Sequence, residues 1–550
     1  MSEKYSIGID FGSLSGRALL VRISDGKCMA DAVMDYPHAV MDTYIPTSDK
    51  KLPADFALQH PKDYLDVLEY DIKSVIEQSG VDPEDIVSIG IDFTCCTMLP
   101  VDKNGTPLCF FEKHAANPYA YVKLWKHHAA QPYADRLNET ALARGEEFML
   151  DYGNKTSSEW MFPKIWETLD KAPEVYEDTD AFMEAGDFIA RYLTGVYKKS
   201  YTYAAVKALY SKERGYPSHD FLASLDERLR YVVEEKMNAP IIDSTDAVGN
   251  VCESVARELG LSEKTVVGCP NPDAHVATAA LHMNQVGDMC LIIGTSSCFM
   301  MLSDKNTTVQ GTCGRQNNVL TPGFWGHESG LCCVGDHFAW VADKLAPESY
   351  RDAAEKEGKP LIKYMVEQAF RKAPGENGLL ALDWWNGNRC LLVDSQLSGM
   401  ILGMNLQTKA EDILRALIEA TAYGTRIVLD NYDAHGLPIK RLIAAGGIAR
   451  KDPLTMQLYA DVLGRDIIVA SSTQIPALAS SIYAAAAAGY DFKECMENMG
   501  SEFVAEYHPN PEASAVYEKL YREYVTLHDY FGRGENNVMK RLRAIKEAQS

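Results

Sequence analysis

The 550-residue sequence lacks the features that mark several large classes of protein. It has no run of five or more basic residues, and its formal net charge is −23. A nucleic-acid partner is therefore not expected, because phosphate contacts need clustered Lys and Arg. No stretch of eighteen apolar residues occurs, and the N-terminus MSEKYSIGID has no charged-then-apolar signal pattern. We expect no membrane association and a cytoplasmic location.

Three familiar motifs are also missing. The 13 cysteines form no CxxC pair, so neither a zinc ribbon nor a thioredoxin-type site is indicated, and we expect reduced, mostly buried thiols. There is no GxxxxGK[ST] and no GxGxxG after a strand, which disfavours P-loop and Rossmann nucleotide sites. An acidic chain that binds an anion such as ATP would need dedicated donors, dipoles and a metal ion.

Length and composition indicate a two-domain globular protein. A chain of 550 residues, 46% hydrophobic and 24% charged, exceeds the size at which one core keeps growing. The strand pattern of the N-terminus restarts near Gly287, so the chain reads as two similar α/β halves. We place the domains at 1–285 and 286–550, with a cleft between them.

Apolar spacing and turn residues predict the individual elements. Residues 5–36 read as a β-meander, and a tail from about residue 511 reads as a charged, solvated helical element. The other predicted strands are 86–93, 265–267, 289–294, 298–302, 440–445 and 465–470, and the other predicted helices are 61–79, 276–281, 409–432, 453–463 and 476–488. The alanine run at the end of the last helix predicts tight packing against a neighbour.

A first glycine turn, which we take to begin at Gly8, has the composition of an anion-binding loop. In Ile9-Asp-Phe-Gly-Ser-Leu-Ser-Gly-Arg17 a carboxylate at a strand end is followed by small and hydroxyl residues and an arginine. The backbone N–H groups of Gly12 and Ser13, the Ser15 hydroxyl and the Arg17 guanidinium could meet phosphate oxygens. Asp10 would then hold Mg²⁺. A plain Gly-Ser hairpin is the alternative.

Two further glycine motifs follow in the second half. Gly294-Thr-Ser-Ser297 repeats the first design, with Thr295 and Ser296 as hydroxyl residues in a tight turn after a strand. Ala444-Ala-Gly-Gly-Ile448 places Gly446 and Gly447 at a strand-to-helix turn, where adenine or ribose could lie against the backbone. A simple connecting turn fits this spacing equally well.

Asp273 follows a predicted strand within Cys269-Pro-Asn-Pro-Asp-Ala-His275 and leads into an apolar helix. The local pattern allows two interpretations, a helix N-cap and a catalytic base.

With these motifs in this order, the sequence resembles the FGGY family of carbohydrate kinases over nearly its whole length. The resemblance is strongest to members that phosphorylate L-ribulose at O5 in L-arabinose breakdown. It is carried by Ile91-Asp-Phe-Thr-Cys-Cys-Thr-Met-Leu-Pro-Val101, Lys123-Leu-Trp-Lys-His-His-Ala-Ala-Gln131, Asp273-Ala-His-Val276 and Trp385-Asn-Gly-Asn-Arg389. It implies two actin-like, ribonuclease-H-like domains around a central cleft.

The resemblance also implies roles for individual residues. Asp273 would be the catalytic base and Asp10 the magnesium-associated aspartate; the first phosphate loop would contain Gly12, Ser13 and Arg17. The second phosphate loop would contain Gly294, Thr295 and Ser296, and the adenosine motif Gly446 and Gly447. The sugar-binding residues would be Thr94, Cys96, Trp125, Lys126, Lys207, Asp273 and Glu328. Without the resemblance, Lys207 would read as a surface lysine.

The sequence departs from the family pattern at Pro272, His327 and Ser329, which we expect to border the sugar pocket. These changes remove no reacting group, but they leave the substrate range open, with D-ribulose and other 2-ketopentoses as further candidates. A xylulose or pentitol kinase of the same family is one alternative, and an actin-fold ATPase without sugar kinase activity is another. The sequence leaves the oligomeric state open, a homodimer included.

Overall fold

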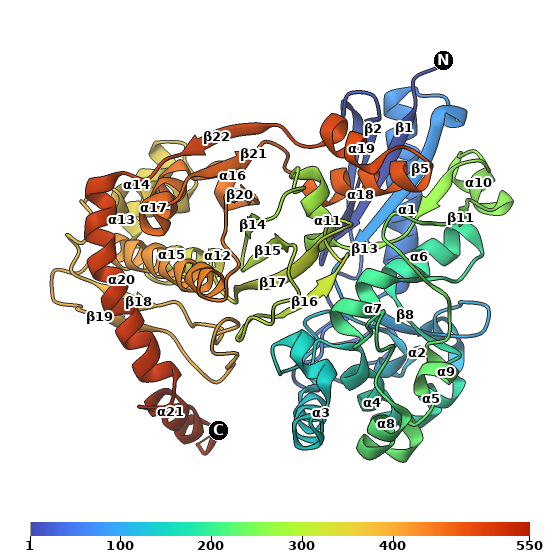
Figure 1. Ribbon diagram of the computed structural model, residues 1–550, viewed down its shortest axis with the longest axis horizontal. Coiled ribbons are helices and arrows are strands. Elements are labelled where there is room, and N and C mark those ends of the chain that lie inside the picture. The colour runs from blue at the N-terminus through green and yellow to red at the C-terminus, as the bar shows by residue number, and fades with distance from the viewer. Residues whose placement is uncertain (1, 550) are drawn as a thin grey trace. The chain divides into compact units, whose positions relative to one another are not determined.

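The structure, a computed structural model, describes residues 2–549 and divides the chain into two compact units. The first unit comprises the residues up to Asn284, Gln316–Gly326 and Gln474–Ser501. The second comprises Gln285–Arg315, His327–Thr473 and the residues from Glu502 onward. Both units combine helices with a mixed β-sheet (Figure 1).

The first unit is built on a seven-stranded sheet with the order β11-β12-β5-β1-β2-β3, in which β13 also pairs with β5. Its strands are β1 (Tyr5–Phe11), β2 (Ser15–Arg22), β3 (Cys28–Asp35), β5 (Ile86–Phe93), β11 (Ala247–Asn250), β12 (Val266–Gly268) and β13 (Asn271–Pro272). The antiparallel pairs β1–β2 and β2–β3 confirm the predicted meander. The pairing of β1 with β5 is parallel.

Helices and a smaller sheet complete this unit. The smaller sheet has the order β4-β7-β6-β8, with β4 (Leu58–Gln59), β6 (Met98–Val101), β7 (Val122–Lys123) and β8 (Ala181–Glu184); β9 (Lys199–Ser200) pairs with β10 (Ile241–Ile242). The helices are α1 (Pro61–Ser79), α2 (Glu112–Ala115), α3 (Gln131–Arg144), α4 (Met161–Lys171), α5 (Pro173–Asp178), α6 (Ala185–Thr194), α7 (Tyr201–Lys207), α8 (His219–Leu225), α9 (Val232–Lys236), α10 (Glu253–Leu259), α11 (Asp273–Ala280), α18 (Ile475–Ala487) and α19 (Phe492–Met499).

Helices α1 and α18 cover opposite faces of the large sheet. Side chains alternate between the two faces of a strand. On one face Phe11 of β1 meets Tyr64 of α1 edge-on, with ring centroids 6.0 Å apart. On the other face Ser6 donates a hydrogen bond from its Oγ to the carbonyl oxygen of Ser481 in α18, at 2.8 Å. Asp10 is four residues after Ser6 on the same strand, so its side chain shares the α18 face.

Two glycines allow α18 to approach the sheet closely. A Cβ atom at Gly8 would lie 1.8 Å from the carbonyl oxygen of Ala477, and one at Gly90 would lie 1.9 Å from that of Ser480. At the alanine run itself, a Cβ atom at Gly268 would lie 3.1 Å from the Cα of Ala484, so the predicted tight packing is confirmed there. The prediction that a turn begins at Gly8 is wrong, because Gly8 lies inside β1 and its missing side chain makes room for the helix.

The second unit repeats this plan. Its seven-stranded sheet has the order β16-β17-β15-β14-β20-β21-β22. The strands are β14 (Asp288–Ile293), β15 (Ser297–Ser303), β16 (Gly314–Asn317), β17 (Trp325–Leu331), β20 (Arg441–Ala445), β21 (Ile467–Ala470) and β22 (Phe503–Tyr507), and β18 (Leu380–Leu382) pairs separately with β19 (Met400–Leu402). As with β1, β14 pairs antiparallel with the next strand and parallel with a later one, β20. The predicted repetition of the two halves is confirmed.

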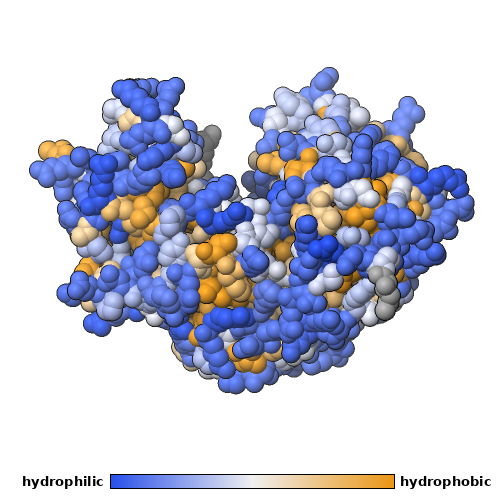
Figure 2. Space-filling view, turned by 90° about the horizontal axis from the view of Figure 1, so that it is seen from above, coloured by the Kyte–Doolittle hydropathy of each residue, from blue (hydrophilic) through white to orange (hydrophobic). Residues whose placement is uncertain are grey.

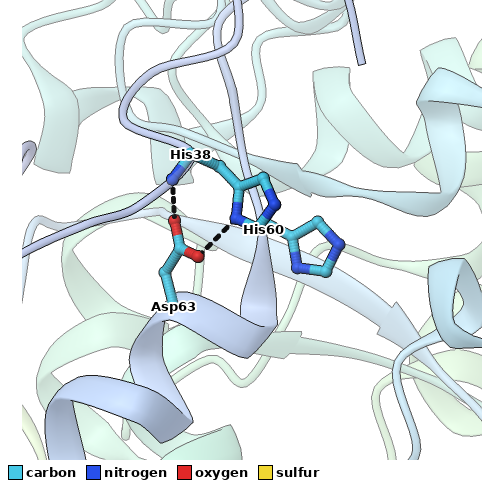
Figure 3. Close-up of side chains that lie close together, drawn as sticks. All are labelled: His38, His60 and Asp63. Carbon is cyan, nitrogen blue, oxygen red and sulfur yellow. Dashed lines mark hydrogen bonds and ion pairs between the residues drawn. The ribbon is translucent and has the colours of Figure 1, made fainter. Parts of the chain in front are cut away.

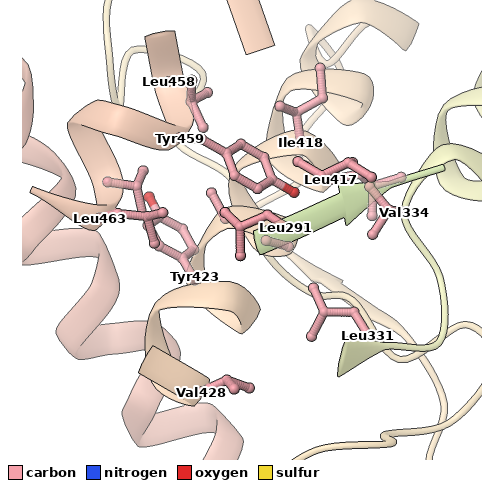
Figure 4. Packing of buried hydrophobic residues seen from close by; sticks show 14 of the residues in the cluster. Leu291, Leu331, Val334, Leu417, Ile418, Tyr423, Val428, Leu458, Tyr459 and Leu463 are labelled. Atoms are coloured by element: carbon pink, nitrogen blue, oxygen red, sulfur yellow. The ribbon is translucent and has the colours of Figure 1, made fainter. Parts of the chain in front are cut away.

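Helix α15 runs through the centre of the second core. Figure 4 shows residues of α15 (Leu417, Ile418, Tyr423) packed with Leu291 of β14 and Tyr459 of α17. The other helices are α12 (Gly335–Lys344), α13 (Glu348–Lys356), α14 (Leu361–Ala369), α16 (Gly447–Lys451), α17 (Pro453–Leu463), α20 (Pro511–Gly532) and α21 (Val538–Glu547); α15 spans Ala410–Ala434.

The prediction of a solvated C-terminal tail is wrong for α20. Its tyrosines Tyr517, Tyr521 and Tyr524 are buried in the second core. The hydroxyl of Tyr524 donates to Oδ1 of Asp383 at 2.8 Å. The helix is amphipathic, and its charged outer face dominated the sequence pattern.

The surface has the character that the composition suggests. The face in Figure 2 is mostly hydrophilic, with apolar residues in small separate patches. Over residues 2–549 no helix is long and apolar enough to cross a membrane. All 13 cysteines are unbridged, and Cys28 is the exposed one among them, which confirms the expectation of mostly buried free thiols.

Candidate active site

The first glycine turn connects β1 to β2 and is closed by its own backbone. The N–H of Gly12 donates to the carbonyl oxygen of Ser15 at 3.0 Å, so this N–H serves the turn itself. The Ser13 Oγ accepts a hydrogen bond from Trp125 Nε1 at 3.0 Å. The Ser15 Oγ accepts one from Arg17 at 3.1 Å. The turn is therefore joined directly to the segment that carries Trp125.

Three aspartates gather beside this turn. The β1–β5 register places Asp10 opposite Asp92, and β13 pairs with the end of β5 immediately before Asp273. Asp10 lies 3.5 Å from the Arg17 guanidinium. Asp92 is fully buried and accepts a hydrogen bond from Ser480 Oγ at 2.6 Å.

Burial and mutual repulsion control the charge of these carboxyl groups. Burial raises the pKa of Asp10, although Arg17 acts in the opposite direction. The pKa of Asp92 is well above its usual range because of burial and the nearby negative charges of Asp10 and Asp273. Adjacent carboxyl groups that cannot all ionise favour a bound cation, so the donor set fits Mg²⁺ at Asp10. Sequence reasoning missed Asp92, although the segment Ile89-Gly-Ile-Asp-Phe93 repeats Ile7-Gly-Ile-Asp-Phe11, which contains Asp10.

Asp273 is the first residue of α11, with Pro272 at the N-cap. Its Oδ1 accepts the N–H of Ala274 at 2.7 Å, and its side chain is partly exposed. Helix α7 supports this corner, because Tyr203 donates from its hydroxyl to the carbonyl oxygen of Asn271 at 2.7 Å. The same helix ends at Lys207. A half-exposed carboxylate on a rigid helix start is suited to accept a proton.

The candidate sugar residues of the first unit differ in accessibility. The Thr94 hydroxyl lies 2.6 Å from that of Thr97, and Lys126 is exposed. The Lys207 ammonium lies 3.1 Å from Glu159 Oε2, and its side chain is 15% exposed. Cys96 is fully buried, and its carbonyl oxygen accepts a hydrogen bond from Lys164 Nζ at 2.6 Å, so a ligand cannot reach this residue in this conformation.

Buried polar side chains anchor the segment that carries Trp125 to helix α4. Lys123 and His127 both bind Oε2 of Glu167, at 2.6 Å and 3.0 Å. These ammonium and imidazole groups help to lower the pKa of Glu167 to about 2, against the effect of burial. The segment between Lys123 and His127, which contains Trp125, is thus held at both ends. Sequence reasoning recognised the Trp-Lys-His-His pattern but gave no sign of Glu167.

The second unit brings three glycines together. The Gly294 N–H donates to Ser296 at 2.9 Å, which closes the second turn, and the Gly294 carbonyl accepts the N–H of Gly335 at 3.0 Å. Helix α12 therefore starts at this turn. Gly446 (φ 98°) approaches the strand that leads into it, because a Cβ there would lie 2.4 Å from the carbonyl oxygen of Ile293.

This arrangement suits nucleotide phosphates. A helix N-terminus beside a tight turn is a ready anion site, and a Cβ at Gly447 would meet nothing within 4 Å. The structure thus places the predicted phosphate turn and the predicted adenosine turn next to each other. Gly335 was missed, since nothing in its local sequence distinguishes it.

Glu328 lies on β17 and is partly exposed. Its neighbours His327 and Ser329 point to the opposite, buried face of that strand, where the Ser329 hydroxyl lies 3.2 Å from that of Tyr432. The expectation that these two residues border the sugar pocket is therefore wrong. They pack within the second core because side chains alternate along a strand.

A separate group of possible metal ligands consists of His38, His60 and Asp63, with ligand atoms within 4.8 Å of one another (Figure 3). Asp63 accepts hydrogen bonds from the backbone N–H and Nδ1 of His38, at 3.0 Å and 2.6 Å. Nδ1 of His60 accepts the N–H of Lys62 at 3.2 Å. The two rings are stacked, with centroids 4.4 Å apart, so their lone pairs do not converge. We interpret the group as the junction between the end of β3 and the start of α1.

Solved structures of known proteins share this fold. The chain is similar to a xylulose kinase from Rhodospirillum rubrum (20% identity, TM-score 0.77, 96% of this chain and 99% of that chain). It is also similar to a gluconate kinase from Lactobacillus acidophilus (18% identity, TM-score 0.78, 97% and 99% covered). These likenesses confirm the predicted two-domain, actin-like or ribonuclease-H-like fold.

Sequence comparisons are more specific. A protein named ribulokinase from Halalkalibacterium halodurans is 46% identical and covers 100% of this chain and 99% of its own. Another ribulokinase, from Bacillus licheniformis, is 48% identical over 98% of each chain. Residues 5–279 and 289–488 match the N-terminal and C-terminal domain models of the FGGY family of carbohydrate kinases. On this evidence the chain belongs to the FGGY family of carbohydrate kinases.

Proposed function

We propose that this carbohydrate kinase transfers the γ-phosphoryl group of ATP to O5 of L-ribulose and forms ribulose 5-phosphate. The observation that carries the proposal is the full-length similarity, at 46–48% identity, to proteins named ribulokinase. The implied setting is L-arabinose breakdown in the cytoplasm. D-Ribulose and other 2-ketopentoses are secondary candidates.

Asp273 is the proposed general base and takes the proton of the sugar hydroxyl during phosphoryl transfer. Its support is its place at a rigid helix start and its partial exposure. Asp10 would hold Mg²⁺, which when bound neutralises negative charge on the phosphate oxygens. Arg17 supplies a further positive charge at the same turn.

The remaining proposed contacts are with the phosphates, the adenosine and the sugar. Ser13 and Ser15 would bind phosphate oxygens from the first unit, while Gly12 would shape their turn, because its N–H is already bonded to the carbonyl oxygen of Ser15. In the second unit the phosphates would be bound by Gly294, Thr295 and Ser296, and adenosine by Gly446 and Gly447. The sugar would be bound by Thr94, Cys96, Trp125, Lys126, Lys207 and Glu328.

We also propose that 1–285 supplies sugar binding, the first phosphate loop and Asp273, while 286–550 supplies the second phosphate loop and adenosine binding. A homodimer is a further proposal, which sedimentation of the purified protein would test.

The deciding experiment supplies the purified protein with ATP, Mg²⁺ and a panel of L-ribulose, D-ribulose, D-xylulose, ribitol and glycerol. ADP release is measured alongside sugar phosphate, and NMR locates the phosphoryl group. We expect kcat/KM to be highest for L-ribulose, with one sugar phosphate formed per ADP. Preference for xylulose or a pentitol would favour the family alternative, and ATP hydrolysis without sugar phosphate would favour a plain ATPase.

A further inference from the structure

Lys164 is a buried cation near the candidate sugar residues. It lies on α4, and its side chain is 0% exposed. Its Nζ donates hydrogen bonds to the carbonyl oxygens of Cys96 at 2.6 Å and Leu124 at 3.0 Å. Burial lowers its pKa. Because a buried ammonium typically costs several kcal/mol, its position needs a reason beyond filling the core.

The two carbonyl groups belong to different segments of the proposed sugar site. Cys96 lies in the turn after β5 that begins with Thr94. Leu124 immediately precedes Trp125, whose indole N–H binds the first glycine turn. One ammonium group therefore joins the two segments and sets the distance between them.

The turn at Cys96 has a specific need for such support. Its φ is 60°, in the left-handed region, which is strained for a residue with a Cβ atom. A short hydrogen bond from a charged donor is among the stronger kinds. The bond from Lys164 to this carbonyl can offset the backbone strain and hold the turn in one conformation.

The neighbouring turn of α4 acts on the same segment. Glu167, three residues after Lys164, binds Lys123 and His127 on either side of Trp125. Lys123 also donates to the carbonyl oxygen of Lys164 at 2.9 Å. Helix α4 thus contacts both proposed sugar-binding segments, and Lys164 is its residue that bonds to the turn at Cys96 and to the segment at Leu124.

We propose that Lys164 is a positioning residue for sugar binding, which fixes the turn at Thr94–Cys96 relative to the segment at Leu124–Lys126. The residue acts through backbone carbonyl groups and does not touch the sugar. This inference rests on the proposed function for its kinetic readout, but its structural readout is independent of the substrate.

Lys164→Met removes the donor and keeps an unbranched side chain of nearly the same length. We expect KM for L-ribulose to rise about tenfold or more, while KM for ATP stays within about twofold. Lys199→Met is the matched control, because Lys199 is also buried in the first unit and donates to the carbonyl oxygen of Met237 at 3.1 Å. It should reduce stability and leave KM for the sugar unchanged.

Two further measurements complete the test. Lys164→Gln keeps an N–H donor and should recover part of the sugar affinity lost in Lys164→Met. If Lys164→Met does not fold, Lys164→Gln is compared with the wild type in its place. Hydrogen exchange should be faster at 94–97 and 122–126 in Lys164→Met than in Lys199→Met.

An unchanged KM for the sugar, an equal effect of Lys199→Met, or unchanged exchange in both segments would overturn the inference. If the wild-type protein phosphorylates no ketopentose, the proposed function fails by itself, and the exchange comparison still decides the role of Lys164.

Discussion

Several carboxyl groups of the first unit are buried without full hydrogen bonding. Their burial raises their pKa values. Burial raises the pKa of Asp71 to about 7 and that of Glu184 to about 8, and the pKa of Asp92 is also well above its usual range. At neutral pH such groups keep much of their protonated form. They lie near groups proposed to bind phosphate and sugar, where perturbed pKa values are common.

Asp71 offers a direct test of this behaviour. Its two carboxyl oxygens have no hydrogen-bond partner in the described part of the chain. Because its folded-state pKa is raised from 3.8 to about 7, the unfolded chain loses this proton first, and stability falls as pH rises from about 4 to about 7. Asp71→Asn should therefore be more stable than wild type at pH 8, by about 1–3 kcal/mol. The difference should shrink at pH 5.

Urea unfolding of both proteins at the two pH values measures this difference. An equal gain at pH 5 and pH 8 would show that the carboxyl charge is not the cause.

Asp273→Asn tests the proposed base. The change keeps the side-chain shape but removes the proton acceptor, so kcat should fall by about 10²-fold or more. ATP binding, measured by calorimetry, should stay nearly intact. Asp466→Asn removes an exposed carboxylate that lies 3.0 Å from His508, and as a control it should keep full turnover. A fully active Asp273→Asn enzyme would remove Asp273 from the mechanism.

At the scale of elements, the contact between α18 and the first sheet connects packing with the site. Gly8 and Gly90 let the helix backbone approach β1 and β5. Ser480 of that helix then reaches Asp92 with a 2.6 Å hydrogen bond. The same helix therefore closes the core and holds a carboxyl group beside Asp10.

Gly8→Ala should disturb both the packing of α18 on the sheet and the position of Asp92. Its Cβ would lie 1.8 Å from a backbone carbonyl oxygen, which no side-chain rotation can relieve, so we expect a loss of at least about 2 kcal/mol of stability. Gly249→Ala in β11 is the control, because the nearest atom to its Cβ would be at 3.6 Å. Thermal unfolding of the two variants decides the point, and equal melting temperatures would contradict the role given to Gly8.

At the scale of the whole molecule, the compact units are not continuous in sequence. Gln474–Ser501 packs with the first unit, although it lies between two segments of the second unit along the chain. The α18 face of the first sheet is therefore covered by residues that lie far from the sheet in sequence. The complete core of the first unit therefore includes a late part of the chain.

Fragments make this dependence measurable. A fragment of residues 1–285 leaves the α18 face uncovered and should lack a cooperative thermal transition. The same fragment with residues 474–501 attached through a flexible linker should unfold cooperatively, as followed by circular dichroism. Cooperative unfolding of the short fragment would show that α18 is dispensable for the first core.

Local signals explain which elements could be predicted. Helix α1 has the predicted bounds Pro61–Ser79, because proline begins it and Gly80, with φ 64°, ends it. Helix α17 agrees for the same reason, with Pro453 at its start and Gly464, with φ 63°, at its C-cap. The tail was misjudged because the buried tyrosine face of α20 is visible only against its partner core. Some motif residues named from the sequence lie in turns or at a helix start, such as Ser13 and Asp273, and others lie in strands, such as Glu328. Their bonded partners were not foreseen.

The sequence by itself determined the local elements, the repeated strand–turn–strand plan and the family motifs, since proline, glycine and apolar spacing act over a few residues. Only the tertiary structure decided which buried groups meet. Asp92 and Ser480 are 388 positions apart, and Lys164 reaches Cys96 across 68. Such contacts depend on strand register and helix docking, which bring distant residues together when the cores close.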